Sequence, residues 1–363
     1  MLKHPGFHDL TIQRVRPEAG DSLAISFLVP EELVEVFAFQ PGQYLTLKAV
    51  VGTDEVRRSY SICSNRTRLD THREIDIGIR AVKGGLFSTW AVRELKAGMT
   101  LSVMSPQGRF VSNRPQAKHR AGFVSGSGIT PVLSIMASCL EQERDSHFTL
   151  VYGNRNTSSV MFNETLQDLK DIYTHRVTLV HVLSRQAQEI ELLHGRLDNN
   201  KVTALLNSVL PPESLDEVFV CGPQGMMEAT CEALTQAGVP DDRIHREVFF
   251  LDQQSQRPVV VTTEADDLQK NTVALTLVLD GKEHQLQMQP DQKILDAGLA
   301  AGLDLPYSCR GGVCCTCRAK VMQGSVIMEK NFTLEEWETR QGFVLSCQSR
   351  PTSDSVKLSF DER

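Results

Sequence analysis

Short segments of alternating apolar and polar residues occupy the first third of the chain. The alternation is clearest in residues 23–28, 44–49 and 74–81, which Pro and Gly residues separate. Such period-two runs are typical of strands with one buried face. The pattern predicts an antiparallel β-barrel or sandwich over residues 1–113, with one helix at 86–95.

The pattern changes after a polar segment, rich in Asn, Pro, Gln, Lys and His, at 112–120. A short apolar strand, a glycine turn and a helical pattern follow one another from residue 121, and a second strand comes after them. This order predicts a doubly wound α/β domain over residues 119–250. Its expected strands are 121–125, 148–152, 176–183 and 217–221, and its expected helices are 132–143 and 224–237.

The last part of the chain begins after a stretch rich in Gln, Asp and Thr at 251–271, which we interpret as a linker with one short strand at 259–262. Strands at 273–279 and 283–288 flank Asp280-Gly281, a hairpin signal. A helix at 294–301, closed by Gly302, precedes a cysteine-rich loop. Residues 272–363 are therefore expected to form a separate small domain.

Composition narrows the class of protein. The chain has 363 residues, 41% hydrophobic and 23% charged, with a net charge of −7. Those values fit a multidomain globular protein and argue against a nucleic-acid or anionic-membrane partner. No apolar region follows the N-terminus and no run approaches the length of a membrane span, so a cytoplasmic location is expected.

Four cysteines have the spacing of an iron–sulfur site. Cys309, Cys314 and Cys317, followed by Cys347, reproduce the C-x4-C-x2-C…C pattern of plant-type [2Fe–2S] proteins, which take four thiolate ligands. Gly311 and Gly312 would let backbone N–H groups turn toward the negative cluster. Cys315 is interpreted as a non-ligand packed behind it. The alternative is a loop of unligated or disulfide-bonded cysteines.

Several glycine and arginine motifs could hold phosphates. Arg58 precedes Tyr60 and Ser61, so one segment could bind a phosphate and face a flat ring. Each such motif alone is weak, since Arg58 in a surface ion pair and Tyr60 in the core would be the better explanation of it taken singly. The others are Gly84-Gly85 before a helix, the turn Gly126-Ser-Gly128-Ile-Thr130-Pro131, and Cys221-Gly222-Pro223 at the end of a strand.

Taken together, these motifs resemble the ferredoxin–NADP reductase superfamily over essentially the whole chain. Within it, the best match is to the reductase subunits of bacterial phenylacetyl-CoA epoxidase systems. The strings that carry the likeness are Pro41-Gly-Gln-Tyr-Leu-Thr-Leu-Lys-Ala, Tyr60-Ser-Ile-Cys, Met104-Ser-Pro-Gln-Gly, Gly126-Ser-Gly-Ile-Thr-Pro, Tyr152-Gly-Asn-Arg, Leu193-His-Gly-Arg, Cys221-Gly-Pro, Tyr307-Ser-Cys and Val344-Leu-Ser-Cys-Gln. The resemblance implies a flavin barrel, a nucleotide domain and a β-grasp [2Fe–2S] domain.

The resemblance also implies roles for individual residues. Arg58 would bind the FAD pyrophosphate, Tyr60 would pack on the flavin ring and Ser61 would lie near its reactive nitrogen. Cys221 would lie where nicotinamide approaches, so Ser61 and Cys221 are the candidate catalytic residues. The remaining candidates are Gly85 and Ser88 beside the FAD phosphates, Gly126, Gly128, Thr130 and Pro131 in the nucleotide phosphate loop, Gly222 and Pro223 after Cys221, and Glu247 and Phe249 on the other face of the flavin.

The chemistry of these cofactors sets the expected function. Nicotinamide gives two electrons as a hydride whereas a [2Fe–2S] cluster accepts one, so a flavin must stand between them. The expected path runs from NADPH to FAD to the cluster to an oxygenase, with diiron phenylacetyl-CoA epoxidase favoured. The alternatives are a reductase for a Rieske oxygenase or hybrid-cluster protein, a self-contained flavin or ferric reductase, and a redox-sensing protein with vestigial cofactors.

The preferred nucleotide is judged from the segment after the second strand of the α/β domain. An acidic residue there would bind a ribose 2′-OH, whereas an arginine would pair with a 2′-phosphate. The segment carries Arg155, with Ser158 and Ser159 nearby, and has no carboxylate before Glu164. We therefore expect NADPH rather than NADH, the alternative being that Arg155 only faces solvent.

Overall fold

A computed structural model describes residues 6–249, 259–262 and 272–362. These residues form two compact units: one contains the first two predicted domains except Phe7 and Arg57–Ser59, which are grouped with the C-terminal module in the other. Most of the expected linker, 251–258 and 263–271, lies outside the described residues.

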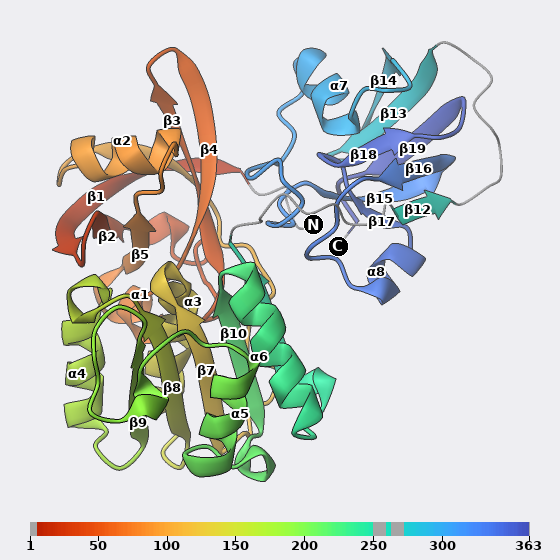
Figure 1. The fold of residues 1–363 in the computed structure, drawn as a ribbon. Helices are drawn as coiled ribbons and strands as arrows, with labels where there is room; N and C mark the ends of the chain where they lie inside the picture. Colours follow the sequence, from red (N-terminus) through yellow and green to blue (C-terminus); the bar gives the residue numbers. More distant parts are fainter. Residues whose placement is uncertain (1–5, 250–258, 263–271, 363) are drawn as a thin grey trace. The chain divides into compact units, whose positions relative to one another are not determined.

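The first domain is an antiparallel six-stranded sheet in the order β4-β3-β6-β1-β2-β5 (Figure 1). An isolated bridge between Ile62 and Ile77 joins the end of β4 to β5, the opposite edge, so the sheet closes around an apolar core. Closure removes exposed strand edges. The elements are β1 (Phe7–Glu18), β2 (Ser22–Leu28), β3 (Tyr44–Val51), β4 (Asp54–Ser61), β5 (Glu74–Arg80), β6 (Thr100–Met104), α1 (Arg66–His72) and α2 (Leu86–Glu94).

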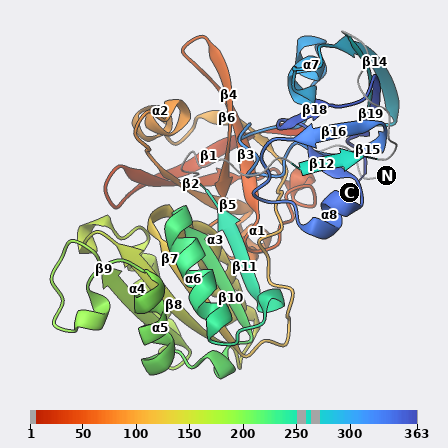
Figure 2. The same ribbon diagram turned by 45° about the vertical axis from the view of Figure 1, so that its right-hand side comes forward.

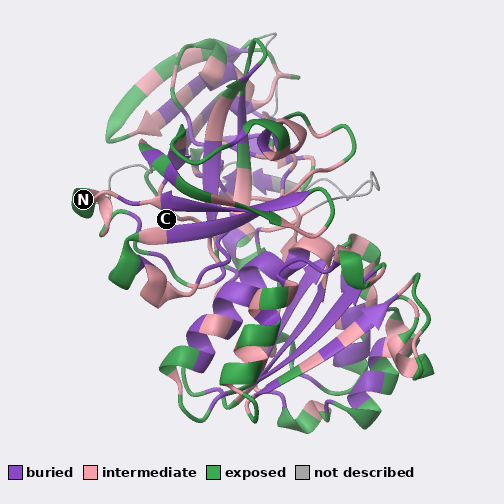
Figure 3. Ribbon diagram, turned by 90° about the vertical axis from the view of Figure 1, so that its left-hand side faces the viewer, coloured by how far each residue is buried: buried purple, intermediate pink, exposed green. Residues whose placement is uncertain are grey.

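The second domain is a parallel five-stranded sheet in the order β11-β10-β7-β8-β9 (Figures 1 and 2). Side chains of α3 and α4 pack on one face of this sheet, and side chains of α5 and α6 pack on the other. Figure 3 shows the central strands buried while the outer faces of the helices remain exposed. The elements are β7 (His119–Ser125), α3 (Ile129–Gln142), β8 (His147–Asn154), α4 (Asn163–Ile172), β9 (Val177–Leu183), α5 (Asn199–Ser208), β10 (Glu217–Gly222), α6 (Gln224–Gln236) and β11 (Ile244–Val248).

The C-terminal unit has a mixed five-stranded sheet, β14-β13-β19-β15-β17, and a three-stranded sheet, β12-β16-β18. Asp280 and Gly281 both have positive φ, 51° and 74°, as the two-residue hairpin between β13 and β14 requires. The elements are β12 (Val259–Thr262), β13 (Val273–Leu279), β14 (Lys282–Met288), α7 (Ile294–Ala300), β15 (Arg318–Gln323), β16 (Ser325–Met328), α8 (Glu336–Arg340), β17 (Phe343–Leu345), β18 (Ser349–Pro351) and β19 (Ser355–Ser359).

The expected fold class is confirmed, and most predicted strands and helices match to within a few residues. The strand expected at 259–262 is present as β12, which pairs antiparallel with β16. The sequence patterns did not indicate α4, α5 or the edge strand β11. In the described part of the chain, no helix combines the length and apolar character needed to cross a membrane.

Candidate functional site

The four predicted cluster ligands lie in two pairs. The Cys314 thiol donates to Cys309, and this bond, aided by backbone N–H groups, lowers the pKa of Cys309 to about 5 although burial opposes the shift. Cys317 donates to Cys347 in the same way and lowers its pKa. Both Cys317 and Cys347 are almost fully buried, and none of the nine cysteines forms a disulfide.

This pairing fits a binuclear cluster. Cys314 lies near enough to Cys317 to raise its pKa, and Cys309 has the same effect on Cys347, so the two pairs are neighbours. A [2Fe–2S] cluster takes two thiolates on each iron, which requires two neighbouring pairs. The donor set and its pairing therefore fit the group that the spacing predicts.

The loop around Cys309 turns backbone donors toward sulfur. The Gly311 N–H donates to the Cys309 sulfur at 3.3 Å, and the Cys309 N–H points to the Cys314 sulfur at 3.5 Å. Gly312 has φ of 83°, and a Cβ there would lie 3.0 Å from the Lys330 carbonyl oxygen. Cys315 also has a positive φ, 52°, and its thiol lies 3.0 Å from the Thr333 hydroxyl.

The flavin candidates lie at the end of β4 and the start of α2. Arg58 is exposed, and Tyr60, two residues along the same strand, has its ring 5.7 Å from that of Phe87. Gly85 caps α2, and a Cβ there would come within 2.5 Å of the Ser88 hydroxyl and of a Val82 methyl, so a larger residue would displace one of these side chains. Ser88 is buried and accepts a hydrogen bond from the Val82 N–H.

The predicted phosphate loop joins β7 to α3. Gly126 has φ of 56°, and its carbonyl accepts a hydrogen bond from the Tyr152 hydroxyl at 2.8 Å. A Cβ on Gly128 would lie 2.3 Å from the Cys221 carbonyl oxygen, so glycine is required for the two loops to meet. Thr130, fully buried, donates to the Ser127 carbonyl, and Pro131 follows in the first turn of α3.

The two candidate catalytic residues meet at Glu247. Cys221 on β10 is the register partner of Glu247 on β11, and the Ser61 hydroxyl from the barrel donates to the Glu247 carboxyl at 3.4 Å. Three residues that are far apart in sequence therefore converge where the barrel meets the carboxyl edge of the parallel sheet. Gly222 and Pro223 lead from here into α6, and Phe249 packs partly buried against the core between the sheet and α3.

Burial sets the protonation of this cluster. Loss of hydration raises the pKa of Glu247 to about 8, and the hydrogen bond from Ser61 opposes the shift only in part. Glu247 is thus protonated at neutral pH. Burial also raises the pKa of the Cys221 thiol well above its ordinary value, and the nearby Glu247 adds to this effect. The site is therefore uncharged at these two positions.

Arg155 lies at the carboxyl end of β8 with its side chain exposed. Its carbonyl accepts a hydrogen bond from the Arg185 N–H at 2.7 Å, which brings a second exposed arginine beside it from the end of β9. The hydroxyls of Ser158 and Ser159 both donate to Asn156 within the turn. Arg185 was not predicted; its signal was a polar Ser-Arg pair directly after an apolar strand.

Three domain families match successive parts of the chain. They are the oxidoreductase FAD-binding domain over residues 10–111, the oxidoreductase NAD-binding domain over 124–232 and the 2Fe-2S iron-sulfur cluster binding domain over 277–352. One component of the 1,2-phenylacetyl-CoA epoxidase of Escherichia coli K12 is 42% identical over 361 residues, which cover 98% of each chain. The chain belongs to the FAD- and [2Fe–2S]-containing ferredoxin reductases.

This reductase has other relatives of the same domain order. The ferredoxin reductase component of 3-ketosteroid-9-alpha-monooxygenase from Rhodococcus rhodochrous is 35% identical, over 97% of this chain and 96% of the relative. Phthalate dioxygenase reductase has the same fold with a TM-score of 0.58 at 21% identity, and the match covers 98% of both chains. The reductase is therefore an oxidoreductase whose domains bind FAD, a nicotinamide nucleotide and a [2Fe–2S] cluster.

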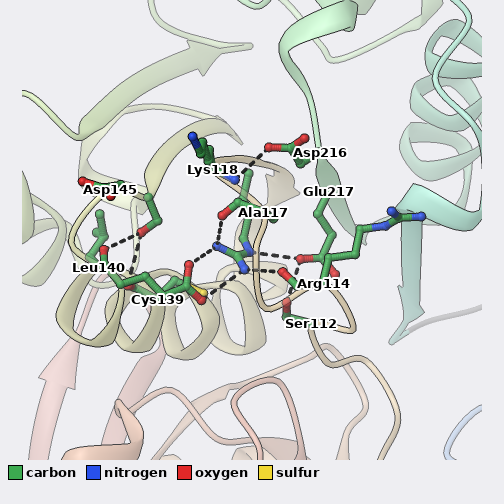
Figure 4. A network of polar contacts seen from close by, with 12 residues as sticks. Ser112, Arg114, Ala117, Lys118, Cys139, Leu140, Asp145, Asp216 and Glu217 are labelled. Atoms are coloured by element: carbon green, nitrogen blue, oxygen red, sulfur yellow. Dashed lines mark hydrogen bonds and ion pairs between the residues drawn. The ribbon is translucent and has the colours of Figure 1, made fainter.

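A buried ion network stabilises the nucleotide domain of the reductase (Figure 4). It lies at the amino-terminal ends of the neighbouring strands β7 and β10, opposite the ends that carry the candidate site. Arg120 and Glu217 are fully buried and paired at 3.0 Å, and Arg120 also binds Glu143 at 2.6 Å. Glu217 accepts further hydrogen bonds from Ser112 at 2.7 Å and from His245 at 2.9 Å. Because His245 lies in the edge strand β11, two residues before Glu247, the network anchors the strand that reaches the candidate site.

Proposed function

We propose that this reductase takes electrons from NADPH and delivers them, through FAD and the [2Fe–2S] cluster, to a diiron phenylacetyl-CoA epoxidase in the cytoplasm. The assignment of the partner rests on the 42% identity to a component of 1,2-phenylacetyl-CoA epoxidase over nearly the whole of both chains. When bound, nicotinamide supplies a hydride, the flavin exchanges electrons in pairs or singly, and the cluster carries one electron at a time.

The chain's own residues support this assignment at the flavin. Arg58 and Tyr60 lie two residues apart on β4, and alternation along a strand directs their side chains to one face. In our proposal, Arg58 pairs with the pyrophosphate and Tyr60 covers the ring, while Gly85 and Ser88 contact the phosphates. The N–H groups at the start of α2 add donors there.

The same reasoning assigns roles at the nicotinamide. Gly126, Gly128, Thr130 and Pro131 would hold the nucleotide phosphates at the start of α3. Ser61 and Cys221 would flank the point of hydride transfer as neutral hydrogen-bonding groups, and Gly222 and Pro223 would leave room for the ring. Protonated Glu247 and Phe249 would exclude water from the other side, since neither carries a charge at neutral pH.

The preference for NADPH rests on the arginines at the ends of β8 and β9. A guanidinium forms a planar, charge-assisted pair with phosphate, and the Arg155 carbonyl already bonds to the Arg185 N–H. Both side chains would bind a 2′-phosphate that NADH lacks. Cys309, Cys314, Cys317 and Cys347 would ligate the cluster, with Cys315 outside it.

The partner is tested by reconstitution. The purified reductase is combined with the oxygenase components of phenylacetyl-CoA epoxidase, phenylacetyl-CoA and NADPH, and epoxide formation is measured against NADPH oxidised. Coupled turnover supports the proposal. NADPH oxidation that proceeds equally without the oxygenase, with no epoxide formed, would instead identify a self-contained flavin or ferric reductase. The oxygenase of the 3-ketosteroid system provides the control for a different partner.

A further inference from the structure

Helix α8 of the [2Fe–2S] module exposes a tryptophan. The side chain of Trp337 is 48% exposed, and the other large apolar residue exposed in the described part of this module is Met322, at 45%. Single exposed apolar residues are ordinary on protein surfaces. Trp337 differs from Met322 because its side chain is hydrogen-bonded and because its helix is bound to the cysteine loop.

The indole of Trp337 is held in one orientation. Its N–H donates to the Glu335 carboxylate at 2.6 Å, and Glu335 caps α8 through reciprocal bonds with Glu338. A side chain that is already ordered loses less entropy when a partner covers it. Tryptophan is also the residue type most enriched among the few that dominate binding energy in protein interfaces.

The segment that carries Trp337 is fastened to the cysteine loop. Glu338, fully buried, accepts a bond from Arg318, the residue after Cys317, at 2.9 Å. The Phe332 N–H donates to the Gly312 carbonyl at 3.1 Å, and Thr333 contacts the Cys315 thiol at 3.0 Å. These three contacts fix α8 relative to the loop, so a protein seated on Trp337 would be held at a constant distance from the cluster ligands.

The rim of this surface is acidic. Glu335 and Glu336 are both exposed, the Glu336 side chain by 85%. Glu336 pairs with Arg340 at 2.6 Å in the same helix, and among the described residues Glu335 has no such ion pair. The whole chain carries a net charge of −7. A complementary surface would present an apolar pocket surrounded by Lys or Arg side chains.

We propose that Trp337, with Glu335 and Glu336 at its rim, is the docking anchor for the oxygenase component that accepts electrons from the cluster. The inference rests on the proposed function, because it takes the partner to be the phenylacetyl-CoA epoxidase oxygenase. That partner would bind the indole in an apolar pocket and place basic groups against the two glutamates. Binding here would bring the acceptor centre close to the cluster, where electron transfer is fast.

The test compares Trp337→Ala with Met322→Ala, a variant matched in exposure on the same module. The Kd for the epoxidase oxygenase and the oxygenase concentration for half-maximal epoxide formation are measured for both. Trp337→Ala is expected to raise both by about 10- to 30-fold, as for a central interface residue. Met322→Ala is expected to change neither. NADPH–ferricyanide turnover and bleaching of the cluster by NADPH should be normal in both variants.

A second variant separates docking from folding. Glu336 lies on the surface, and Glu336→Lys reverses one rim charge without disturbing the core. The variant should weaken binding of the oxygenase about tenfold at low salt and much less at about 0.5 M salt. Unchanged Kd values in both Trp337→Ala and Glu336→Lys, with a wild type that binds and turns over, would overturn the docking site alone. A wild type that neither binds nor supports the epoxidase would overturn the proposed function and the docking site together.

Discussion

The buried Arg120–Glu217 pair allows a quantitative test of what holds the nucleotide domain together. Replacing Arg120 with Met keeps most of the side-chain volume but removes the charge that faces Glu217. Glu217 would then remain fully buried, and its donors among the described residues would be Ser112, Asn113 and His245. Breaking one side of a buried ion pair costs about 3–5 kcal/mol.

The expected change is large enough to measure by thermal unfolding. In a domain of this size, 1 kcal/mol corresponds to roughly 2–4 °C in Tm, so Arg120→Met should lower Tm by about 6–20 °C. The matched control is Arg114→Ala, which removes a surface pair with Asp242 whose side chains are 35% and 71% exposed. Such a pair contributes about 0–1 kcal/mol. The Arg114 carbonyl, which accepts from Arg120, remains in this control.

The pH dependence of the Tm of Arg120→Met tests whether the unpaired charge on Glu217 causes the loss of stability. Burial would raise the pKa of Glu217, but hydrogen bonds from His245, Ser112 and the Asn113 N–H outweigh it and hold the pKa below the ordinary value. Stability from such a group is present above its unfolded pKa and is lost as pH falls. The Arg120 guanidinium, 3.0 Å from Glu217, also favours the ionised carboxylate, so its removal should raise the Glu217 pKa, and the loss of Tm should be smaller at about pH 5 than at about pH 8. A Tm within about 3 °C of Arg114→Ala at both pH values would refute this reasoning.

Three further predictions concern the candidate site. The predicted cluster ligands are Cys309, Cys314, Cys317 and Cys347. Serine in place of any one of them should remove the visible and EPR signals of the [2Fe–2S] cluster, while Cys315→Ser should retain these signals. The ligand set would be wrong if Cys315→Ser lost the signals and Cys314→Ser did not. Arg155→Ala should lower kcat/KM for NADPH by about 10- to 100-fold, because a charge-assisted bond contributes about 1.5–3 kcal/mol, and leave NADH nearly unchanged; equal losses would exclude Arg155 from discrimination. Wild-type kcat should fall as pH rises through about 8, where Glu247 ionises, and Glu247→Gln should flatten this limb of the profile; an identical limb in both proteins would assign it to another group.

Local sequence determined the elements of this protein and the identity of its cofactor motifs. Period-two alternation located three of the six barrel strands, β2, β3 and β5, the Asp280-Gly281 pair located a hairpin whose two residues both have positive φ, and cysteine spacing alone indicated the cluster. These signals depend on residues close together in the chain, where turn chemistry, strand periodicity and ligand spacing are set by local geometry. The family assignment followed from the same motifs and is confirmed by the relatives.

The tertiary structure alone decided which of those residues are in contact and which of them are protonated. No local pattern in the sequence indicates that Ser61 and Glu247 lie 3.4 Å apart, because the contact depends on the barrel packing against the parallel sheet. The pKa of Glu247 near 8 comes from burial, which no local pattern encodes. The edge strand β11 was missed for a related reason: its five residues, Ile-His-Arg-Glu-Val, carry two charged side chains and a histidine, and its conformation is imposed by pairing with β10 rather than by its own propensity.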